Sequence, residues 1–501
     1  MPGHVALTQR RMMRDEGSDE QHRHPPLGAS PSESASATWF HEVRHGAWGQ
    51  PLMTRLLVLD TLPEGIFWSA PFALDADFTA EDPLALDYLG QQVGLWLFRG
   101  FTTRTNRAQY YAVVLYGLHL AERAVQEFGY PGDDGTRTRL FERWERYWAL
   151  ATLEFRRGHL ARGDEDAMRG IRGATRAWFP GTRPLPLDFP LISRQNELGG
   201  LGAYLTSLRE YGLVFPGSLR VTPAAREILA SFWSEPGERD WSHLYEAYAL
   251  AALDLDTRHI PRARGRLTLA GLGKRSRLSS LVQRHRTQQQ ERLWNALFVA
   301  ARDGSTLPLA EALIAAQRDG VEDAEAILEG ILAERWGALS TENRNKVEVA
   351  LTFGRLARML LDRFDRAYGY VDEHGWVATL GEVANASFPK REAMALRETC
   401  HALLRAQDAR RFRRLRYHGP DFVTLLTKLT SSGPTASLEH LLDYHRSVQR
   451  SRRGGGAWIR QEEGKLVMQV AGYNGYKSEA GFPGMKLNVV RQLLADLGRL
   501  R

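Results

Sequence analysis

Cysteine is almost absent from this chain, and lysine does not occur before Lys274. The single cysteine, Cys400, excludes an intrachain disulfide and any zinc site built from more than one cysteine. It lies in an amphipathic run, residues 391–405, so we interpret it as a small buried apolar residue. No apolar run reaches about 18 residues, the length that a membrane-spanning helix needs. The polar N-terminal stretch also lacks the apolar core of a secretory signal, so the sequence predicts a cytoplasmic protein without a membrane partner.

Positive charge comes mostly from arginine, and it is gathered in clusters. The formal net charge is +7 and the pI is near 9.5, which is mild for 501 residues. No acidic residue occurs from Thr257 to Gln290, a stretch rich in arginine. Several arginines on one surface neutralise phosphates and release counterions, so the clustering predicts affinity for nucleic acid. The alternative is a solvated helix face; a GC-rich genome explains an excess of arginine but not its clustering.

Three clusters supply the predicted phosphate contacts. The clusters span residues 258–286, 405–416 and 446–453, and the residues predicted to contact phosphate are Arg264, Arg266, Lys274, Arg275 and Arg277; Arg410, Arg413 and Arg414; and Arg452 and Arg453. Contacts to phosphate are independent of base sequence, so they predict binding to double-stranded DNA without specifying a target.

Length and composition predict several domains. A hydrophobic content of 43% over 501 residues allows about two to four domains. Residues 1–38, rich in serine and proline, have too little apolar surface to offset the entropy of ordering, so we predict a disordered tail. The predicted divisions after it are a helical N-terminal domain (39–190), a winged-helix-like module (191–235), a helical C-terminal domain (236–450) and a hairpin–helix cap (451–501).

Apolar residues recur at helical spacing through most of the chain. The predicted helices are 105–128, 223–232, 288–301, 308–317, 324–336, 341–367, 391–405, 437–448 and 486–497. Two β-prone runs, 457–461 and 465–470, predict a hairpin near the end of the chain. The predicted fold class is therefore mainly α: a multi-domain helical protein with an embedded winged-helix-like module and a small C-terminal β-hairpin plus helix.

The segment 199–223 has the pattern of a winged helix. Leu201, Tyr204 and Leu208 fall on one helical face, and Gly212 favours a left-handed turn that ends the helix. Two short β-prone runs then flank residues 216–218. Winged helices usually present a helix to a DNA groove, so this segment predicts a DNA-binding module.

Only two basic residues of this module are placed to meet DNA. Arg209 lies in the predicted helix and Arg220 in the predicted wing. A single base in the helix weakens direct readout of base edges, which favours backbone binding or contact with a protein.

A second anion-binding pattern precedes the aromatic pair Tyr110-Tyr111. Arg104 and Arg107 lie one turn apart near the predicted helix start, where unpaired backbone N–H groups favour anions. Their guanidinium groups either bind phosphate or form ion pairs with nearby acidic residues at the start of the helix. The stretch Thr102–Tyr111 resembles uncharacterised multi-helical proteins encoded in bacterial anti-phage defence loci. That resemblance implies a defence setting and no activity.

Several short stretches match catalytic or nucleotide-binding motifs in part, but the residues around them do not fit those sites. His41–His45 matches the H-E-x-x-H zinc pattern, but it follows the predicted tail, and glycines at 46 and 49 weaken a helix, so we predict no metal there. Asp421 with Glu463 and Lys465 is a poor fit to a magnesium-dependent nuclease, because helical residues and a turn surround them. Gly271–Lys274 is not a Walker A motif. The sequence predicts no catalytic residue and no cofactor.

Three functions from different classes follow. The first is a DNA-binding, non-catalytic component of a bacterial multi-protein system, with a helicase, ATPase or nuclease encoded nearby and a role in defence against phage or plasmids. The second is a metal-dependent nuclease or hydrolase. The third is a scaffold whose winged helix contacts protein. The arginine clusters favour the first.

Overall fold

The computed structural model describes the chain in eight stretches: residues 72–73, 82–159, 168–233, 242–276, 287–301, 304–406, 409–453 and 455–500. The predicted tail (1–38) and the His41–His45 motif lie outside the described residues.

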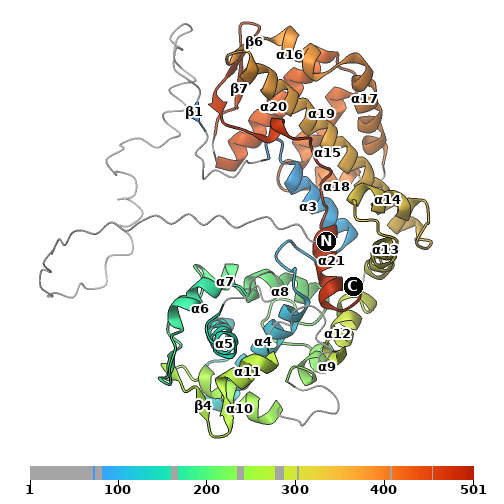
Figure 1. The fold of residues 1–501 in the computed structure, drawn as a ribbon. Helices are drawn as coiled ribbons and strands as arrows, with labels where there is room; N and C mark the ends of the chain where they lie inside the picture. The colour runs from blue at the N-terminus through green and yellow to red at the C-terminus, as the bar shows by residue number, and fades with distance from the viewer. Residues whose placement is uncertain are drawn as a thin grey trace, which may run out of the picture. The chain divides into compact units, whose positions relative to one another are not determined.

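Helices account for most of the described chain, as predicted (Figure 1). In chain order they are α3 (Leu86–Leu97), α4 (Ala108–Phe128), α5 (Asp134–Phe155), α6 (Ile171–Ala177), α7 (Gln195–Leu198), α8 (Gly200–Glu210), η2 (Pro223–Ala225), α9 (Arg226–Ala230), α10 (Ser242–Leu253), α11 (Leu269–Ser276), α12 (Thr287–Trp294), η3 (Asn295–Val299), α13 (Thr306–Arg318), α14 (Ala324–Leu332), α15 (Thr341–Glu373), α16 (Leu380–Ser387), α17 (Lys390–Arg405), α18 (Ala409–Arg413), α19 (Gly419–Leu429), α20 (Pro434–Arg453), η4 (Gly475–Lys477) and α21 (Leu487–Asp496).

Short strands form small sheets beside these helices. In the described residues, β1 (Phe72–Ala73) pairs in parallel with β9 (Val470–Ala471), β2 (Leu185–Pro186) pairs antiparallel with β3 (His259–Ile260), β4 (Ala263–Arg264) pairs antiparallel with β5 (Leu267–Thr268), and β8 (Lys465–Met468) lies antiparallel between β6 (Val377–Thr379) and β7 (Ile459–Glu462). The hairpin β7–β8 and the helix α21 are the predicted C-terminal elements. The third strand, β6, was not predicted, because three residues are too few to show an alternating pattern.

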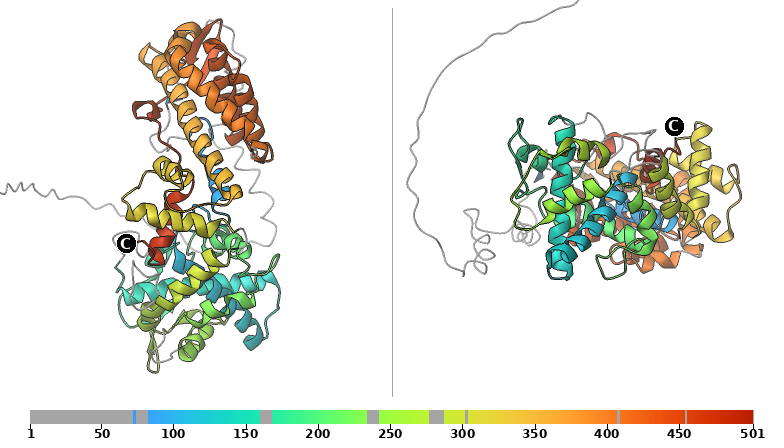
Figure 2. Two further views of the ribbon diagram at one scale, coloured as in Figure 1. Left: turned by 90° about the vertical axis from the view of Figure 1, so that its right-hand side faces the viewer. Right: turned by 90° about the horizontal axis from the view of Figure 1, so that it is seen from below.

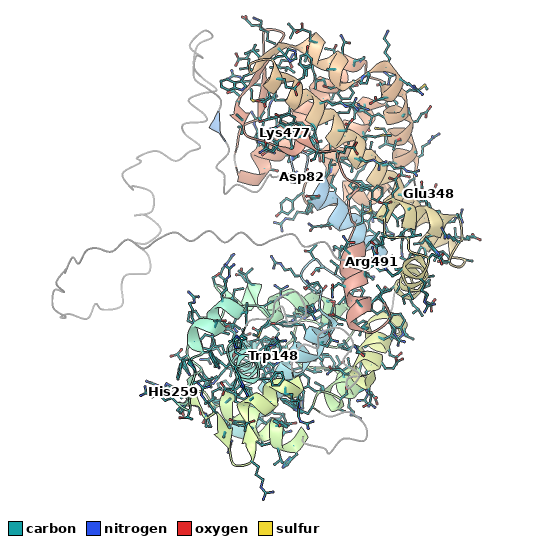
Figure 3. The ribbon with its side chains drawn as sticks, in the orientation of Figure 1. Asp82, Trp148, His259, Glu348, Lys477 and Arg491 are labelled. Atoms are coloured by element: carbon teal, nitrogen blue, oxygen red, sulfur yellow. The ribbon has the colours of Figure 1, made fainter. Side chains whose placement is uncertain are left out.

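Tryptophans of α5 fix the packing of the first group of helices. Trp148 is fully buried, and its Nε1–H donates to the Ser276 carbonyl at the end of α11 (2.8 Å; Figure 3). A Cβ built at Gly273 would lie 1.9 Å from the Ala151 carbonyl oxygen, so only glycine lets α11 approach α5 this closely. The glycines of the segment Gly271–Lys274 therefore serve helix packing.

The long helix α15 organises a second group of helices. It contacts α3, α16, α17 and α20, and Figure 2 shows it running beside the later helices. The rings of Phe353 on α15, Phe412 on α18 and Phe422 on α19 pack together, with centroids 5.5 Å apart for the pairs that include Phe412. Burying three such rings supplies much of the stability of this group. No described helix is both long enough and apolar enough to cross a membrane.

The C-terminal helix α21 ties distant parts of the chain together. Before its first turn, Lys486 donates from Nζ to the Phe101 carbonyl (3.0 Å), and burial lowers the pKa of this lysine to about 8. On its side, Arg491 donates to the Glu322 carbonyl ahead of α14 (3.0 Å; Figure 3). At its last residue, Asp496 accepts a hydrogen bond from the backbone N–H of Ala108 at the start of α4 (2.9 Å).

The segment 191–235 contains a helix, a tight stop, a turn and a short helix in the predicted order. α8 ends at Glu210, and Gly212 follows in the left-handed region with φ 67°. A single antiparallel bridge joins Val214 to Val221, so the hairpin is shorter than the two predicted strands. The described residues therefore contain the predicted helix and turn, but in place of the two predicted strands they contain one bridge.

Candidate nucleic-acid interface

The predicted anion grip at the start of α4 has one buried arginine and one exposed arginine. Arg107 is 2% exposed, and its Nε lies 2.8 Å from the Asp496 carboxylate. Burial raises the pKa of Asp496, and the charge and hydrogen bond of Arg107 oppose that rise. Arg104 is exposed, and its carbonyl accepts a hydrogen bond from Arg169 (2.5 Å). The guanidinium of Arg107 thus closes the start of the helix, with a partner that is distant in sequence.

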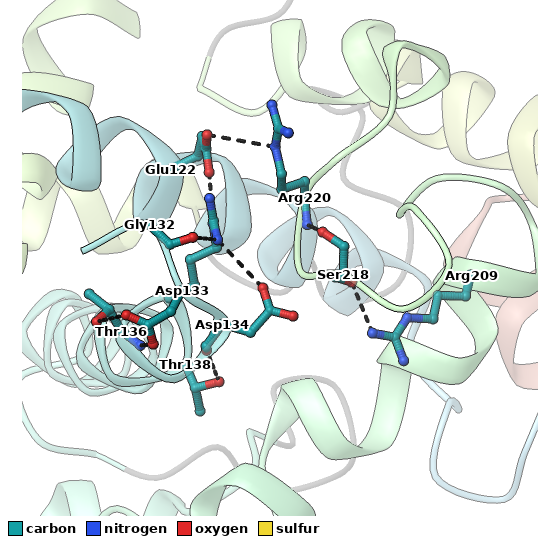
Figure 4. Close-up of polar contacts among 10 residues, drawn as sticks. Glu122, Gly132, Asp133, Asp134, Thr136, Thr138, Arg209, Ser218 and Arg220 are labelled. Atoms are coloured by element: carbon teal, nitrogen blue, oxygen red, sulfur yellow. Dashed lines mark hydrogen bonds and ion pairs between the residues drawn. The ribbon is translucent and has the colours of Figure 1, made fainter. Parts of the chain in front are cut away.

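Two arginines of the 191–235 segment, Arg209 and Arg220, contact groups at or beside the short hairpin (Figure 4). Arg209 donates from Nη2 to the Ser218 carbonyl (2.9 Å), which links α8 to the turn. Arg220 is exposed and lies 3.7 Å from the Glu122 carboxylate of α4. Both guanidinium groups therefore have protein partners on their own surface.

The outward face of α8 carries a single basic residue, Arg209, whose guanidinium donates to the Ser218 carbonyl of the turn. On the inner face of α8, Tyr204 and Leu208 are buried, and the Tyr111 hydroxyl lies 2.6 Å from the Ser207 hydroxyl. The inner face therefore packs on α4. The residues on the opposite face, Gly202 and Thr206, are exposed and uncharged. A recognition helix normally places donors and bases toward DNA, so this surface is poorly suited to base readout.

The first arginine cluster divides between structural and exposed members. Arg264 and Arg266 are exposed at the turn joining β4 to β5, and Lys274 is exposed on α11. Arg275 folds back: its Nη1 donates to the Trp233 carbonyl (3.4 Å), and its guanidinium lies 5.8 Å from the Tyr245 ring. Arg277 lies outside the described residues. Three basic side chains of this cluster therefore face outward.

The second cluster forms one face of the short helix α18. Arg410 and Arg413 of α18 and Arg414, the residue after it, are exposed at positions i, i+3 and i+4, a spacing that places side chains on one side of a helical turn. Phe412 points the other way and is 1% exposed, so it anchors the helix in the core. A Cβ at Gly419 would lie 2.0 Å from the Phe412 carbonyl oxygen, and glycine there lets α19 begin directly against α18.

Among the described residues, no carboxylate lies within ion-pair distance of Arg410, Arg413 or Arg414. By contrast, Arg355 and Arg358 on α15 both contact Glu325. Three like charges on one helix face repel one another. A bound anion would remove that repulsion, so this face is ready to accept phosphate.

A hollow of about 390 Å³ lies beside this arginine face. It is lined by Arg413 and by one stripe of α19: Pro420, Val423, Thr424, Thr427 and Lys428. The volume is within the about 300–1,000 Å³ of sites for small ligands. Arg413 and Lys428 supply positive charge, and proline and valine make an apolar floor. The hydroxyls of Thr424 and Thr427 donate to the Pro420 and Val423 carbonyls of α19. We call Arg410, Arg413, Arg414 and this hollow the α18–α19 surface.

The sequence-based prediction identified the arginines of this surface but missed its other half. Lys428, Thr424 and Thr427 were not singled out, because no single residue of α19 is unusual. The helical spacing of residues 420, 423, 424, 427 and 428 was the available signal. It becomes meaningful only once α19 is known to lie against α18.

The remaining predicted residues do not form a site with one another. Arg452 and Arg453 end α20, and their side chains lie outside the described residues. Asp421 accepts a hydrogen bond from Ser447 (2.7 Å), whereas Lys465 begins β8, next to the turn that joins β7 to β8. Within the described ranges, no three His, Cys, Asp or Glu side chains gather as metal ligands would.

Cys400 is fully buried, and burial raises the pKa of its thiol to about 12. A thiol with a raised pKa is a poor nucleophile, which agrees with the predicted role as a small apolar residue.

No family model, curated protein or solved structure matches the chain.

Proposed function

We propose that this protein binds nucleic acid by its phosphate backbone, through the α18–α19 surface, as a non-catalytic component of a larger assembly. The proposal keeps the nucleic-acid partner predicted from the sequence. It moves the main contact from the winged-helix-like segment to α18 and α19, because Arg209, the single basic residue of α8, is engaged by the Ser218 carbonyl.

One observation supports this proposal above the others. Arg410, Arg413 and Arg414 share an exposed helix face, and no described carboxylate neutralises them. Phosphate groups would supply the missing negative charge, with bidentate geometry that suits the guanidinium group. Contacts of this kind give affinity that is independent of base sequence and falls steeply with salt.

The test is a titration of labelled oligonucleotides at several salt concentrations. The double variant Arg413→Glu/Arg414→Glu should bind at least about tenfold more weakly, and the slope of log affinity against log salt should fall by about 0.7–0.9 for each phosphate that the variant no longer binds. The matched control is Arg172→Glu/Arg176→Glu, which reverses two exposed arginines one turn apart on α6. Equal weakening by both pairs would indicate a response to net charge and would refute the proposed surface.

A second candidate function, contact with a partner protein, is favoured by the 191–235 segment, which we propose to be a reduced winged helix. Phe215 at its turn is 44% exposed, and the uncharged residues Gly202 and Thr206 lie on the outward face of α8. An exposed aromatic ring beside small residues is typical of protein contacts. Loss of co-purification with the neighbouring gene products in a Phe215→Ser variant, with nucleic-acid affinity unchanged, would support this role.

The bacterial defence setting remains a proposal based on residues 102–111. It implies that a helicase, ATPase or nuclease partner supplies the chemistry. A strain that carries the gene with its neighbours should lose protection against phage when Arg413 and Arg414 are reversed and retain it with the α6 control pair.

A further inference from the structure

We propose that the α18–α19 surface takes single-stranded nucleic acid in preference to a duplex, with Tyr417 as a stacking platform for a base. This inference rests on the proposed function and names the substrate class of the same surface.

The first observation is an exposed aromatic ring next to the arginine face. Tyr417 lies four residues after the end of α18 and two residues before the start of α19, and it is 51% exposed. The Arg416 guanidinium lies 5.1 Å from the centre of its ring. The edge of the ring also meets Tyr88 of α3, with centroids 6.3 Å apart. Tyr417 is thus held from two sides while half of its surface remains in contact with solvent.

The fixed position of Tyr417 has a local cause. Gly419 donates its N–H to the Tyr417 carbonyl (2.6 Å), and His418 between them adopts φ 57°. This turn ends the chain segment from α18 and starts α19. Pro420, which lines the hollow, lies three residues after Tyr417 along the chain.

The floor of the hollow is the second observation. Val423 is 5% exposed and Pro420 is exposed, and together with the threonine methyl groups they form an apolar strip between Arg413 and Lys428. Phosphate groups alone would make no favourable contact with such an apolar strip. A base or a sugar would cover it, while the phosphates on either side reach the two cations.

These features distinguish the two forms of nucleic acid. In a duplex the bases are stacked on each other, so neither Tyr417 nor the apolar strip would meet a base face. In a single strand each base offers a free face, and sites for single strands combine a basic track with aromatic rings. The arginine face, the ring and the strip together therefore fit a single strand better than a duplex.

The test compares three ligands with the full chain: a 20-nucleotide oligo-dT, the matching oligo-U, and a 20-base-pair duplex. We expect both single strands to bind at least about tenfold more tightly than the duplex at equal salt. Tyr417→Leu should weaken binding of the single strands by about 5- to 150-fold, the effect of losing one stacked base, and leave duplex binding unchanged. Tyr417→Phe should keep wild-type affinity. Phe215→Leu, which removes another half-exposed ring, is the matched control and should have no effect.

Other outcomes of the titrations distinguish failure of this inference from failure of the proposed function. Duplex affinity equal to or above that of the single strands, with both lowered by Arg413→Glu/Arg414→Glu, would overturn this inference and leave the proposed function standing. Equal weakening of duplex and single strand by Tyr417→Leu would refute a stacking role. Absence of binding to all three ligands would refute the proposed function itself. Polyglutamate bound as tightly as oligo-dT would overturn the inference in favour of an acidic protein. Tighter binding of oligo-dT or of oligo-U would support the inference and identify DNA or RNA as the strand.

Discussion

The start of α4 and the outer face of α18 both carry arginines one turn apart. Arg107 of the first pair and Arg413 of the second differ in burial and in ion pairing. Arg107 is buried and paired with Asp496 at 2.8 Å. Arg413 is exposed, borders a hollow, and has no described carboxylate in ion-pair range. Neighbouring residues in sequence do not reveal this difference, because Asp496 lies 389 positions from Arg107.

This comparison shows what decides the role of an arginine in a chain that has many. A buried guanidinium stabilises the fold only if a carboxylate and further hydrogen bonds compensate its lost hydration. Asp496 meets that requirement, since it also accepts the Ala108 N–H and its carbonyl accepts from Gln109 (2.9 Å). An exposed arginine face keeps its hydration and remains available to an external anion. The following changes test this division of roles.

The largest expected effect is a loss of stability at α4. Arg107→Met leaves the Asp496 carboxylate buried without a cation, and breaking a buried pair in this way costs about 3–5 kcal/mol. Arg413→Met, on the exposed face, should change the free energy of unfolding by less than about 0.5 kcal/mol. Denaturant unfolding measures both variants.

A double variant separates the pair from its surroundings. Arg107→Met/Asp496→Leu removes both charges and should be more stable than Arg107→Met alone, although the Ala108 N–H then loses its acceptor. If Arg107→Met and Arg413→Met were equally stable, the contrast between the two regions would fail.

The second effect concerns a buried carboxylate that is held by neutral donors. Glu145 of α5 accepts from the Gly200 N–H at the start of α8 (2.6 Å) and from Gln195 Nε2 (3.0 Å). Burial raises its pKa to about 7, although both hydrogen bonds lower the pKa in part. The folded protein therefore holds a proton that the unfolded chain releases above its ordinary pKa of about 4.3. The free energy of unfolding should fall by about 3 kcal/mol as pH rises through this window, up to about pH 7.

Glu145→Gln isolates that contribution. Glutamine is neutral at every pH, so the difference in unfolding free energy between variant and wild type should grow between pH 5 and pH 7.5 and level off above it. A constant difference across this range would show that Glu145 does not titrate there. Chemical unfolding at a series of pH values gives the measurement.

The sequence predicted helices well where their apolar spacing is long and their ends are marked. For α15 the start at Thr341 was placed at the observed residue, where Ser340 caps the helix by accepting from the Asn343 N–H. The predicted end fell at Ala367, short of Glu373, because polar residues interrupt the apolar pattern there. β6 was missed because its pairing with β8 depends on residues far along the chain.

Site prediction from sequence had a similar limit. The arginines of α18 stood out as a cluster, whereas Lys428 and Tyr417 gain meaning from the packing of α19 on α18. Burial of Arg107 required knowledge of α21. Local composition therefore identified where charge gathers, and only tertiary structure divided it into structural and available charge.

A third prediction concerns a variant that places a carboxylate of the protein itself beside the exposed arginine face. Thr424 lines the hollow with Arg413 and Lys428, so Thr424→Glu would place a carboxylate where phosphate should bind. Affinity for oligo-dT should fall several-fold and the salt slope by about 0.7, the value of one phosphate of a single strand. Thr435→Glu, at an exposed position in the first turn of α20, adds the same charge elsewhere and should leave the slope unchanged. An unchanged slope in Thr424→Glu would mean that the hollow is not part of the interface.

The smallest effect is expected at the other exposed arginines, on the turn between β4 and β5. Arg264 is the last residue of β4, and Arg266 lies in the two-residue turn that follows, where Gly265 has φ 60°. Ordering two long side chains on such a turn costs entropy that binding a single phosphate barely offsets. Arg264→Ala/Arg266→Ala should therefore lower the salt slope by less than about 0.7, the value of one phosphate, in the same titration. If this pair reduced the slope as much as Arg413→Glu/Arg414→Glu does, the main interface would lie at β4–β5, because exposed charge alone would then predict binding as well as charge beside a hollow.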